Sequence, residues 1–185
     1  IFNKYNGKDK SLITRLLHSR GVTTDEEIYE FLHPLEMKII HPKAFCDMEK
    51  VVERLSLAID NGEKIVIHGD FDADGVTSTS LLYRTFKYLG ADVNYFIPDR
   101  EKEGHGFDTK ALVKIMTQVK PKVIISCDCG ISDVDAVNFL NSFKIDVIIT
   151  DHHEAPDVLP KAYGIINPKA PNALDEKLTT KQIES

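Results

Sequence analysis

The chain has 185 residues, of which 42% are hydrophobic and 28% are charged. This length and composition suit one globular domain with a small appendage, and they exclude a disordered, collagen-like or low-complexity chain. The net charge is −6, from 29 acidic and 23 basic residues, which argues against a generic basic binder of nucleic acids that gains its affinity by neutralising phosphates. An acidic cluster that binds divalent cations can still recruit phosphate, because the ions reverse the local charge.

The cellular setting is indicated by the cysteines and by the lack of long apolar runs. No run approaches the ~18–20 residues of a membrane span. The three cysteines, Cys46, Cys127 and Cys129, are too few and too irregularly spaced for a disulfide scaffold, which favours a reducing, cytoplasmic setting. We interpret Cys127 and Cys129 as small packing residues rather than as redox groups or metal ligands.

Residues 1–63 are expected to form a helical region in front of the main domain. Apolar residues between positions 12 and 17 have helical spacing, and a second short helix is expected after Thr24. Glu27 follows Thr24 by three residues, which is the spacing of a capping box. A third helical pattern covers 51–59.

Short apolar strands alternate with helical patterns from residue 64 onward. Strands are expected at 65–67, 93–97, 123–125, 147–149 and 165–166, and helices at 111–119 and 132–143, while 81–89 is expected to continue a helix that stops at Gly90. Ser132, with Asp135 three residues later, is predicted to cap the last helix. Alternating strands and helices indicate βαβ crossovers and a parallel sheet. We therefore predict an α/β domain with a Rossmann-like, doubly wound parallel sheet over residues 64–185.

Acidic residues and histidines follow the predicted strands. The segments after the first four strands are His68-Gly-Asp-Phe-Asp-Ala-Asp-Gly75, Pro98 to Gly106, Cys127-Asp-Cys-Gly130 and Asp151-His-His-Glu154. Ligands of open parallel sheets bind beyond the carboxyl ends of the strands, so these side chains should converge on one edge. Ionised carboxylates at one site repel each other unless a cation lies between them. Carboxylate and imidazole ligands suit Mn²⁺, Mg²⁺ or Zn²⁺, and their number is sufficient for the two-ion clamp used in phosphoester cleavage.

Three other interpretations of the first acidic segment are weaker. In an EF-hand loop that starts at Asp70, the twelfth residue should be glutamate, but it is Leu81. In a haloacid-dehalogenase-type phosphatase, Asp72 would be the nucleophile and Asp74 a general acid. That interpretation explains neither Asp128 nor the paired histidines. A merely solvated turn also leaves the acids and histidines at the other strand ends unexplained.

These motifs resemble the DHH phosphoesterases and, within them, the RecJ-type single-stranded-DNA-specific exonucleases. The similar pieces are 68–75, Ile97-Pro-Asp-Arg-Glu-Lys-Glu-Gly104, 128–130, 151–153 and Ile166-Asn-Pro-Lys169. The Pro-Asp-Arg segment and Asn-Pro-Lys favour RecJ over its relatives. Oligoribonucleases, cyclic-dinucleotide phosphodiesterases and family II pyrophosphatases of this family tend to have a proline in the first motif, which this chain lacks.

The resemblance implies a site for two ions of Mn²⁺ or Mg²⁺. His68 and Asp72 would hold one ion, and Asp74 and His152 would hold the other. Asp128 would bridge the two ions and is counted among the catalytic residues.

The resemblance also assigns roles around the ions. His153 would contact the scissile phosphate and stabilise its developing charge. Asp151 would orient a histidine, and Asp70 would either bond within its loop or reach a metal through water. Arg100 would bind a DNA phosphate, and His105 stands where the family often has a tyrosine for stacking.

The activity implied by the resemblance is two-metal, 5′-to-3′ exonucleolytic hydrolysis of single-stranded DNA in repair and recombination. A single-strand-binding protein and a helicase are the implied partners, and no membrane is involved. A later catalytic aspartate, a second DHH-associated domain and an OB-type module are not recognisable in these residues, so we expect the N-terminal part of a longer protein, weakly active or inactive by itself. Two alternatives remain open: a phosphoesterase for short oligonucleotides or nucleotides, and an inactive scaffold.

Overall fold

A computed structural model of the chain describes residues 11–36, 41–99 and 106–175. Contacts divide the chain into two compact units, residues 1–40 and 41–185. The first unit contains α1 (Leu12–Ser19), α2 (Asp25–Leu32) and a 3₁₀ turn, Pro34–Glu36. The predicted capping box of α2 is confirmed, because Glu27 N donates to Thr24 Oγ1 at 3.1 Å and Thr24 N donates to Glu27 Oε2 at 3.0 Å.

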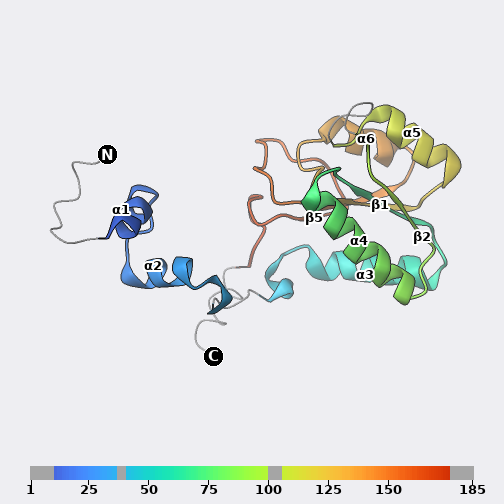
Figure 1. Cartoon of the computed structure of the whole chain (residues 1–185). Coiled ribbons are helices and arrows are strands. Elements are labelled where there is room, and N and C mark those ends of the chain that lie inside the picture. Colours follow the sequence, from blue (N-terminus) through green and yellow to red (C-terminus); the bar gives the residue numbers. More distant parts are fainter. Residues whose placement is uncertain (1–10, 37–40, 100–105, 176–185) are drawn as a thin grey trace. The chain divides into compact units, whose positions relative to one another are not determined.

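The second unit contains a parallel sheet covered by helices (Figure 1). The sheet has five strands in the order β2-β1-β3-β4-β5. The elements of this unit are a 3₁₀ turn (Pro42–Ala44), α3 (Met48–Asp60), β1 (Ile65–Gly69), α4 (Ala73–Tyr88), β2 (Val93–Phe96), α5 (Thr109–Gln118), β3 (Val123–Cys127), α6 (Val134–Ser142), β4 (Asp146–Thr150) and β5 (Gly164–Ile166). Helices cover both faces of the sheet, so the predicted doubly wound α/β fold is confirmed. No helix among the described residues is long and apolar enough to cross a membrane.

Helix α3 belongs to the same compact unit as the sheet, although it precedes residue 64. Val51 and Ala58 of α3 are buried in one cluster with side chains of the sheet. The contact-based unit therefore begins at His41, earlier than the change of sequence pattern from which we placed the main domain at 64–185.

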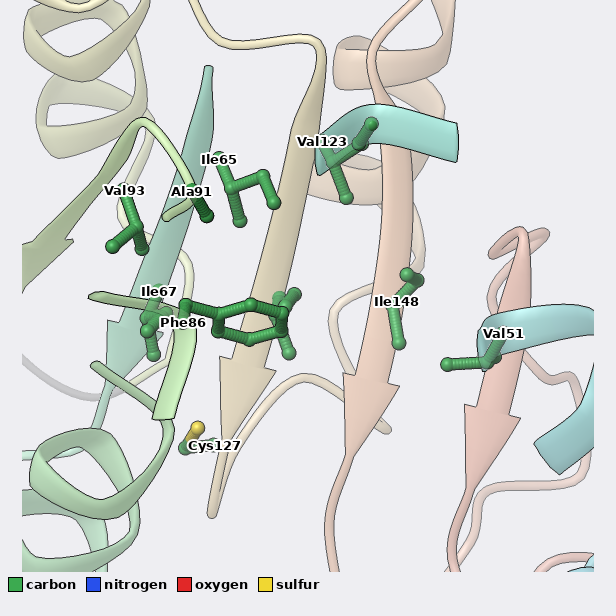
Figure 2. Packing of buried hydrophobic residues seen from close by; sticks show 11 residues of the cluster. Val51, Ile65, Ile67, Phe86, Ala91, Val93, Val123, Cys127 and Ile148 are labelled. Atoms are coloured by element: carbon green, nitrogen blue, oxygen red, sulfur yellow. The ribbon is translucent and has the colours of Figure 1, made fainter. Parts of the chain in front are cut away.

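The sheet lies between two helical layers, α3 and α4 on one face and α5 and α6 on the other (Figure 1). Alternate residues of the central strands enter different cores, as the pleat requires. Figure 2 shows the first core, in which Ile65, Ile67, Val123 and Ile148 from the strands share a cluster with Phe86 of α4. The second core contains Val66, Ile124, Val147 and Ile149 from the strands and Leu112, Ile115, Val137 and Leu140 from the helices. Because both faces are covered, the strands are apolar almost throughout.

The strand order places a topological switch point between β1 and β3. From β1 the chain passes through α4 to β2 on one side, and it then returns through α5 to β3 on the other side of β1. Ligands of such sheets bind at the carboxyl ends of the strands that flank this point. The site is therefore expected where Asp70 follows β1 and Asp128 follows β3.

The start of one helix was not predicted from the sequence, and the start of another differs from the prediction. Helix α4 begins at Ala73, ahead of the segment 81–89 that is expected to continue a helix, because Asp72 Oδ1 accepts hydrogen bonds from Asp74 N and Gly75 N, both at 3.0 Å. The prediction that Ser132 caps α6 is wrong. The helix starts after Asp133, whose carboxylate accepts a hydrogen bond from Phe107 N at 3.1 Å instead of capping the helix.

Candidate metal centre

The turn after β3 places Asp128 at the edge of the sheet. Asp128 has a φ of 61°, a left-handed conformation that aspartate tolerates better than most residues. Its backbone N donates to Thr150 O at 2.9 Å, which ties the turn to the end of β4. Gly130 has a φ of 108°, and a Cβ there would lie 2.7 Å from Ser126 Oγ. The turn therefore needs glycine at position 130 and fixes the backbone of Asp128.

Three carboxylates meet at the ends of β1 and β3. One oxygen each of Asp70, Asp72 and Asp128 lies within 4.8 Å of the other two. The close approach depends on Gly75 at the start of α4, because a Cβ there would lie 2.3 Å from Asp70 O.

Burial and the neighbouring Asp72 raise the pKa of Asp128. The Gly75 N–H, and then the hydrogen bond with Asp128, lower the pKa of Asp72. A divalent ion between the two carboxylates would relieve the repulsion that contributes to the raised pKa of Asp128.

Two histidines reach Asp128 from the loop after β4. His152 Nε2 lies 2.8 Å from Asp128 Oδ1, and ligand atoms of Asp128, His152 and His153 lie within 4.8 Å of one another. His153 Nδ1 lies 2.7 Å from Asp151 Oδ1. Asp128 therefore belongs to two groups of ligand atoms, one made of carboxylates and one containing imidazoles.

The carboxylate of Asp151 holds the loop after β4 through hydrogen bonds. It is buried, and its two oxygens accept hydrogen bonds from Ile131 N at 3.0 Å, His152 N at 2.7 Å and His153 N at 3.1 Å. Burial alone would raise the pKa of Asp151, but the hydrogen bonds from His153 and from the backbone outweigh it, so the pKa is lowered. The same contact with Asp151 raises the pKa of His153 against the effect of burial. Asp151 thus orients His153 and favours its protonated form.

The structure brings together some of the proposed ligands and leaves others apart. Asp72, Asp128, His152 and His153 gather as described, and Asp70 joins them directly. His68 and Asp74 belong to neither group. Asp74 is exposed in the first turn of α4. The proposed substrate contacts Arg100 and His105 lie outside the described residues.

His68 belongs to neither group of ligand atoms and is surrounded by other neighbours. Its side chain is fully buried, and its ring centroid is 4.8 Å from that of Phe107 and 5.4 Å from that of Phe96. Its Nδ1 lies 3.8 Å from Cys129 Sγ. The alternation along β1 explains this placement, because His68 shares a face with Val66, on the side of α5 and α6.

Two shallow cavities flank Asp128. One, of about 230 Å³, is lined by Asp74, Ser78, Asp128, Thr150, Asp151 and His152. The other, of about 210 Å³, is lined by Asp70, Gly106, Asp128, Asp133, Asp151, His153 and residues 129–132. Sequence reasoning missed Ser78 and Thr150, although Ser78 follows Asp74 by four residues and thus shares its face of the helix.

Comparison with known proteins identifies the family. Residues 64–182 match the DHH family, N-terminal domain, and the chain belongs to this family. Among curated proteins it is similar to the single-stranded-DNA-specific exonuclease RecJ of Bacillus subtilis, with 41% identity over 160 residues that cover 86% of this chain and 20% of that protein. It is also similar to RecJ of Escherichia coli, with 36% identity over 159 residues that cover 85% of this chain and 26% of that protein. The chain thus spans about a quarter or less of the length of these relatives.

The chain is also similar to solved structures of RecJ exonucleases. A crystal structure of exonuclease RecJ bound to manganese matches with a TM-score of 0.67 and 31% identity, covering 76% of this chain and 35% of that one. RecJ of Thermus thermophilus in complex with Mn²⁺ matches with a TM-score of 0.62 and 27% identity, covering 89% of this chain and 22% of that one.

Proposed function

We propose that the protein is a metal-dependent phosphodiesterase, specifically a 5′-to-3′ exonuclease of single-stranded DNA of the RecJ type. The observation that carries the proposal is the position of Asp128. Its carboxylate belongs to two groups of possible metal ligands, one with the carboxylates of Asp70 and Asp72 and one with the imidazoles of His152 and His153. Such sharing suits a bridging ligand between two divalent ions. Support for the substrate comes from the relatives, which are named single-stranded-DNA-specific exonucleases.

We propose that Mn²⁺ or Mg²⁺ is held by Asp72, Asp128 and His152. Asp74 lines the cavity beside the last two and would complete the second ion's ligands. The proposal that His68 is a further ligand of the first ion rests on the family resemblance alone, since His68 belongs to neither group of ligand atoms and its ring packs against Phe96 and Phe107. The donor set fits these ions, since hard carboxylate oxygens with one or two imidazoles suit Mn²⁺ and Mg²⁺. When bound, the ions would lower the pKa of water and stabilise charge on the phosphoryl group.

His153 supplies a further positive charge at this edge of the sheet. Because its Nδ1 bonds to Asp151, Nε2 is the ring nitrogen that would contact a phosphate oxygen. Asp151 also raises the pKa of His153, so the imidazole can donate a proton in a hydrogen bond to a phosphate oxygen. A donor held in place before the reaction stabilises negative charge that develops in the transition state.

The test is the replacement of Asp128 by asparagine in the full-length gene product. Asparagine tolerates the left-handed backbone of this position, so Asp128→Asn removes the shared carboxylate without straining the turn. Release of mononucleotides from a labelled single-stranded DNA oligonucleotide with Mn²⁺ should fall by at least about 100-fold. Asp60→Asn at the end of α3 serves as the control. A variant at position 128 that keeps most of the rate would contradict the assignment.

A second candidate function is a phosphoesterase for short oligonucleotides or nucleotides. It is favoured by the small size of the two cavities beside Asp128, about 210 and 230 Å³. Comparing the turnover of a dinucleotide with that of a long single strand separates the two functions. Faster turnover of the dinucleotide would favour this second candidate.

We further propose that the protein acts in the cytoplasm in DNA repair and recombination, with a single-strand-binding protein and a helicase as partners. The family resemblance of the motifs supports this proposal. Co-precipitation from nuclease-treated extract tests the partners, since the nuclease removes bridging DNA. Failure to recover either protein would count against this part.

A further inference from the structure

A buried asparagine after β5 contacts the loop that contains the two histidines. Asn167 is fully buried. Its Nδ2 donates to His153 O at 3.0 Å, and its Oδ1 accepts from Lys169 N at 2.8 Å. Both ends of the amide are used, so the bond to Lys169 fixes the orientation in which the NH₂ group faces His153.

The loop is held from two sides as a result. On one side, Asp151 accepts the backbone and ring hydrogen bonds of His153. On the other side, Asn167 binds the carbonyl of the same residue. Two more contacts join these segments, because Asp151 N donates to Ile166 O at 3.0 Å and Lys169 Nζ lies 2.9 Å from Glu154 Oε1.

We propose that Asn167 is a positioning residue that fixes His153 for its contact with the scissile phosphate. The inference rests on the proposed function for the role of His153. The hydrogen bonds by which Asp151 and Asn167 hold His153 depend on the fold alone. Without the NH₂ donor, the carbonyl of His153 loses its partner, and the loop can then move away from Asp151. A donor displaced by about 1 Å loses much of its effect on the transition state, whereas substrate binding far from the reacting phosphate is little affected.

The test compares Asn167→Asp with a control at an exposed asparagine. Aspartate keeps the size of the side chain and the acceptor for Lys169 N, but it removes the donor to His153 O. Asn141→Asp is the control, because Asn141 Nδ2 also donates to a backbone carbonyl, that of Lys161 at 2.9 Å, away from the site. Should Asn167→Asp fail to fold, as judged by circular dichroism, Asn167→Ser removes the amide without adding charge.

Two measurements are made on each variant. Amide hydrogen exchange of the metal-free chain reports loop opening without any need for activity. Exchange at His152 and His153 should quicken by about 10-fold or more in Asn167→Asp, while exchange at Ile124 in the core stays unchanged. In the full-length gene product, kcat on single-stranded DNA should fall by about 10- to 100-fold with KM within about 3-fold.

The outcomes separate this inference from the proposed function. Unchanged exchange at His153, or changed exchange with an unchanged kcat, would overturn the positioning role. An equal loss of kcat in Asn141→Asp would also overturn it, because the effect would then be general destabilisation. If the wild-type protein cleaves no single-stranded DNA, the proposed function fails, and the exchange data still decide whether Asn167 clamps the loop.

Discussion

The three thiols of the chain have different environments, and their reactivity should differ accordingly. Cys46 is exposed, whereas Cys127 and Cys129 are buried. Burial raises the pKa of both buried thiols, and nearby carboxylates such as Asp133 raise that of Cys129 further. Because the thiolate is the reactive form, we predict that iodoacetamide modifies only Cys46 in the native chain. Peptide mass spectrometry checks this, with the denatured chain as the control in which all three react. Labelling of native Cys129 would contradict its packing beside His68.

The contact between His153 and Asp151 predicts a pH dependence of the metal-free chain. The pKa of His153 is raised in the folded state, so its contribution to stability is complete below about pH 6.5, its unfolded value, and is lost as the pH rises through the raised pKa. The pKa of Asp151 is lowered, so its contribution is present above about pH 3.9 and is lost as the pH falls through the lowered value.

Raising the pH from about 6 to about 9 should therefore remove the contribution of His153 to stability and leave that of Asp151 in place. The His153 side chain is 57% exposed, which limits the change in the free energy of unfolding to about 0.2–1 kcal/mol. Urea unfolding in EDTA measures it, and His153→Gln should show a weaker loss over the same range. Equal pH dependence of the two chains would mean that the contact contributes nothing to stability.

At the scale of elements, the junction of β1 and α4 depends on two glycines. A Cβ at Gly69 would lie 2.0 Å from Thr79 Oγ1, and one at Gly75 would lie 2.3 Å from Asp70 O. Alanine normally stabilises a helix relative to glycine by about 0.5–1 kcal/mol. Here we predict the opposite sign, with Gly75→Ala lowering the free energy of unfolding by about 1–3 kcal/mol. Chemical denaturation measures the change, and Thr77→Ala on the exposed side of α4 should stay within about 0.5 kcal/mol of wild type. A stabilising Gly75→Ala would contradict the close approach of α4 to Asp70.

The elements themselves were largely predictable from local pattern. The apolar runs defined all five strands, and their alternation with helices was sufficient for a parallel, doubly wound sheet. The capping box at Thr24 was also predictable, because it depends on residues three apart. The caps of α4 and α6 were not, since Asp72 and Asp133 compete with neighbouring polar residues and tertiary contacts decide between them. In α6 the contact is the bond from Phe107 N to Asp133, which joins residues distant in sequence.

The candidate site was predictable in its position and less so in its composition. Parallel strands place their carboxyl ends together, which brought Asp72, Asp128 and His152 to one edge as expected. The face on which a strand-end residue lies depends on the pleat and on the layer that covers it. His68 therefore packs against aromatic rings, while Asp70 joins the carboxylates because α4 approaches closely at Gly75. Neither effect is encoded in the spacing of the motif.

At the scale of the whole molecule, metal binding should be linked to the stability of the entire sheet. The proposed ligands follow β1, β3 and β4, so they come together only when the central strands are assembled. An ion that binds the folded chain alone stabilises it by about 2.7 kcal/mol at a hundredfold excess over its Kd. For a chain of this length, such a change raises Tm by about 5–11 °C.

We therefore predict that Mn²⁺ raises Tm by this amount, as measured by differential scanning calorimetry, and that EDTA reverses the shift. Asp72→Asn should abolish most of it, because asparagine still caps α4 but offers no carboxylate to the ion. Asp60→Asn, at the exposed end of α3, should keep the full shift and thus control for the loss of one negative charge. If Asp72→Asn keeps the shift as well, Mn²⁺ binds elsewhere on the chain, and the edge formed by β1 and β3 is not the metal centre.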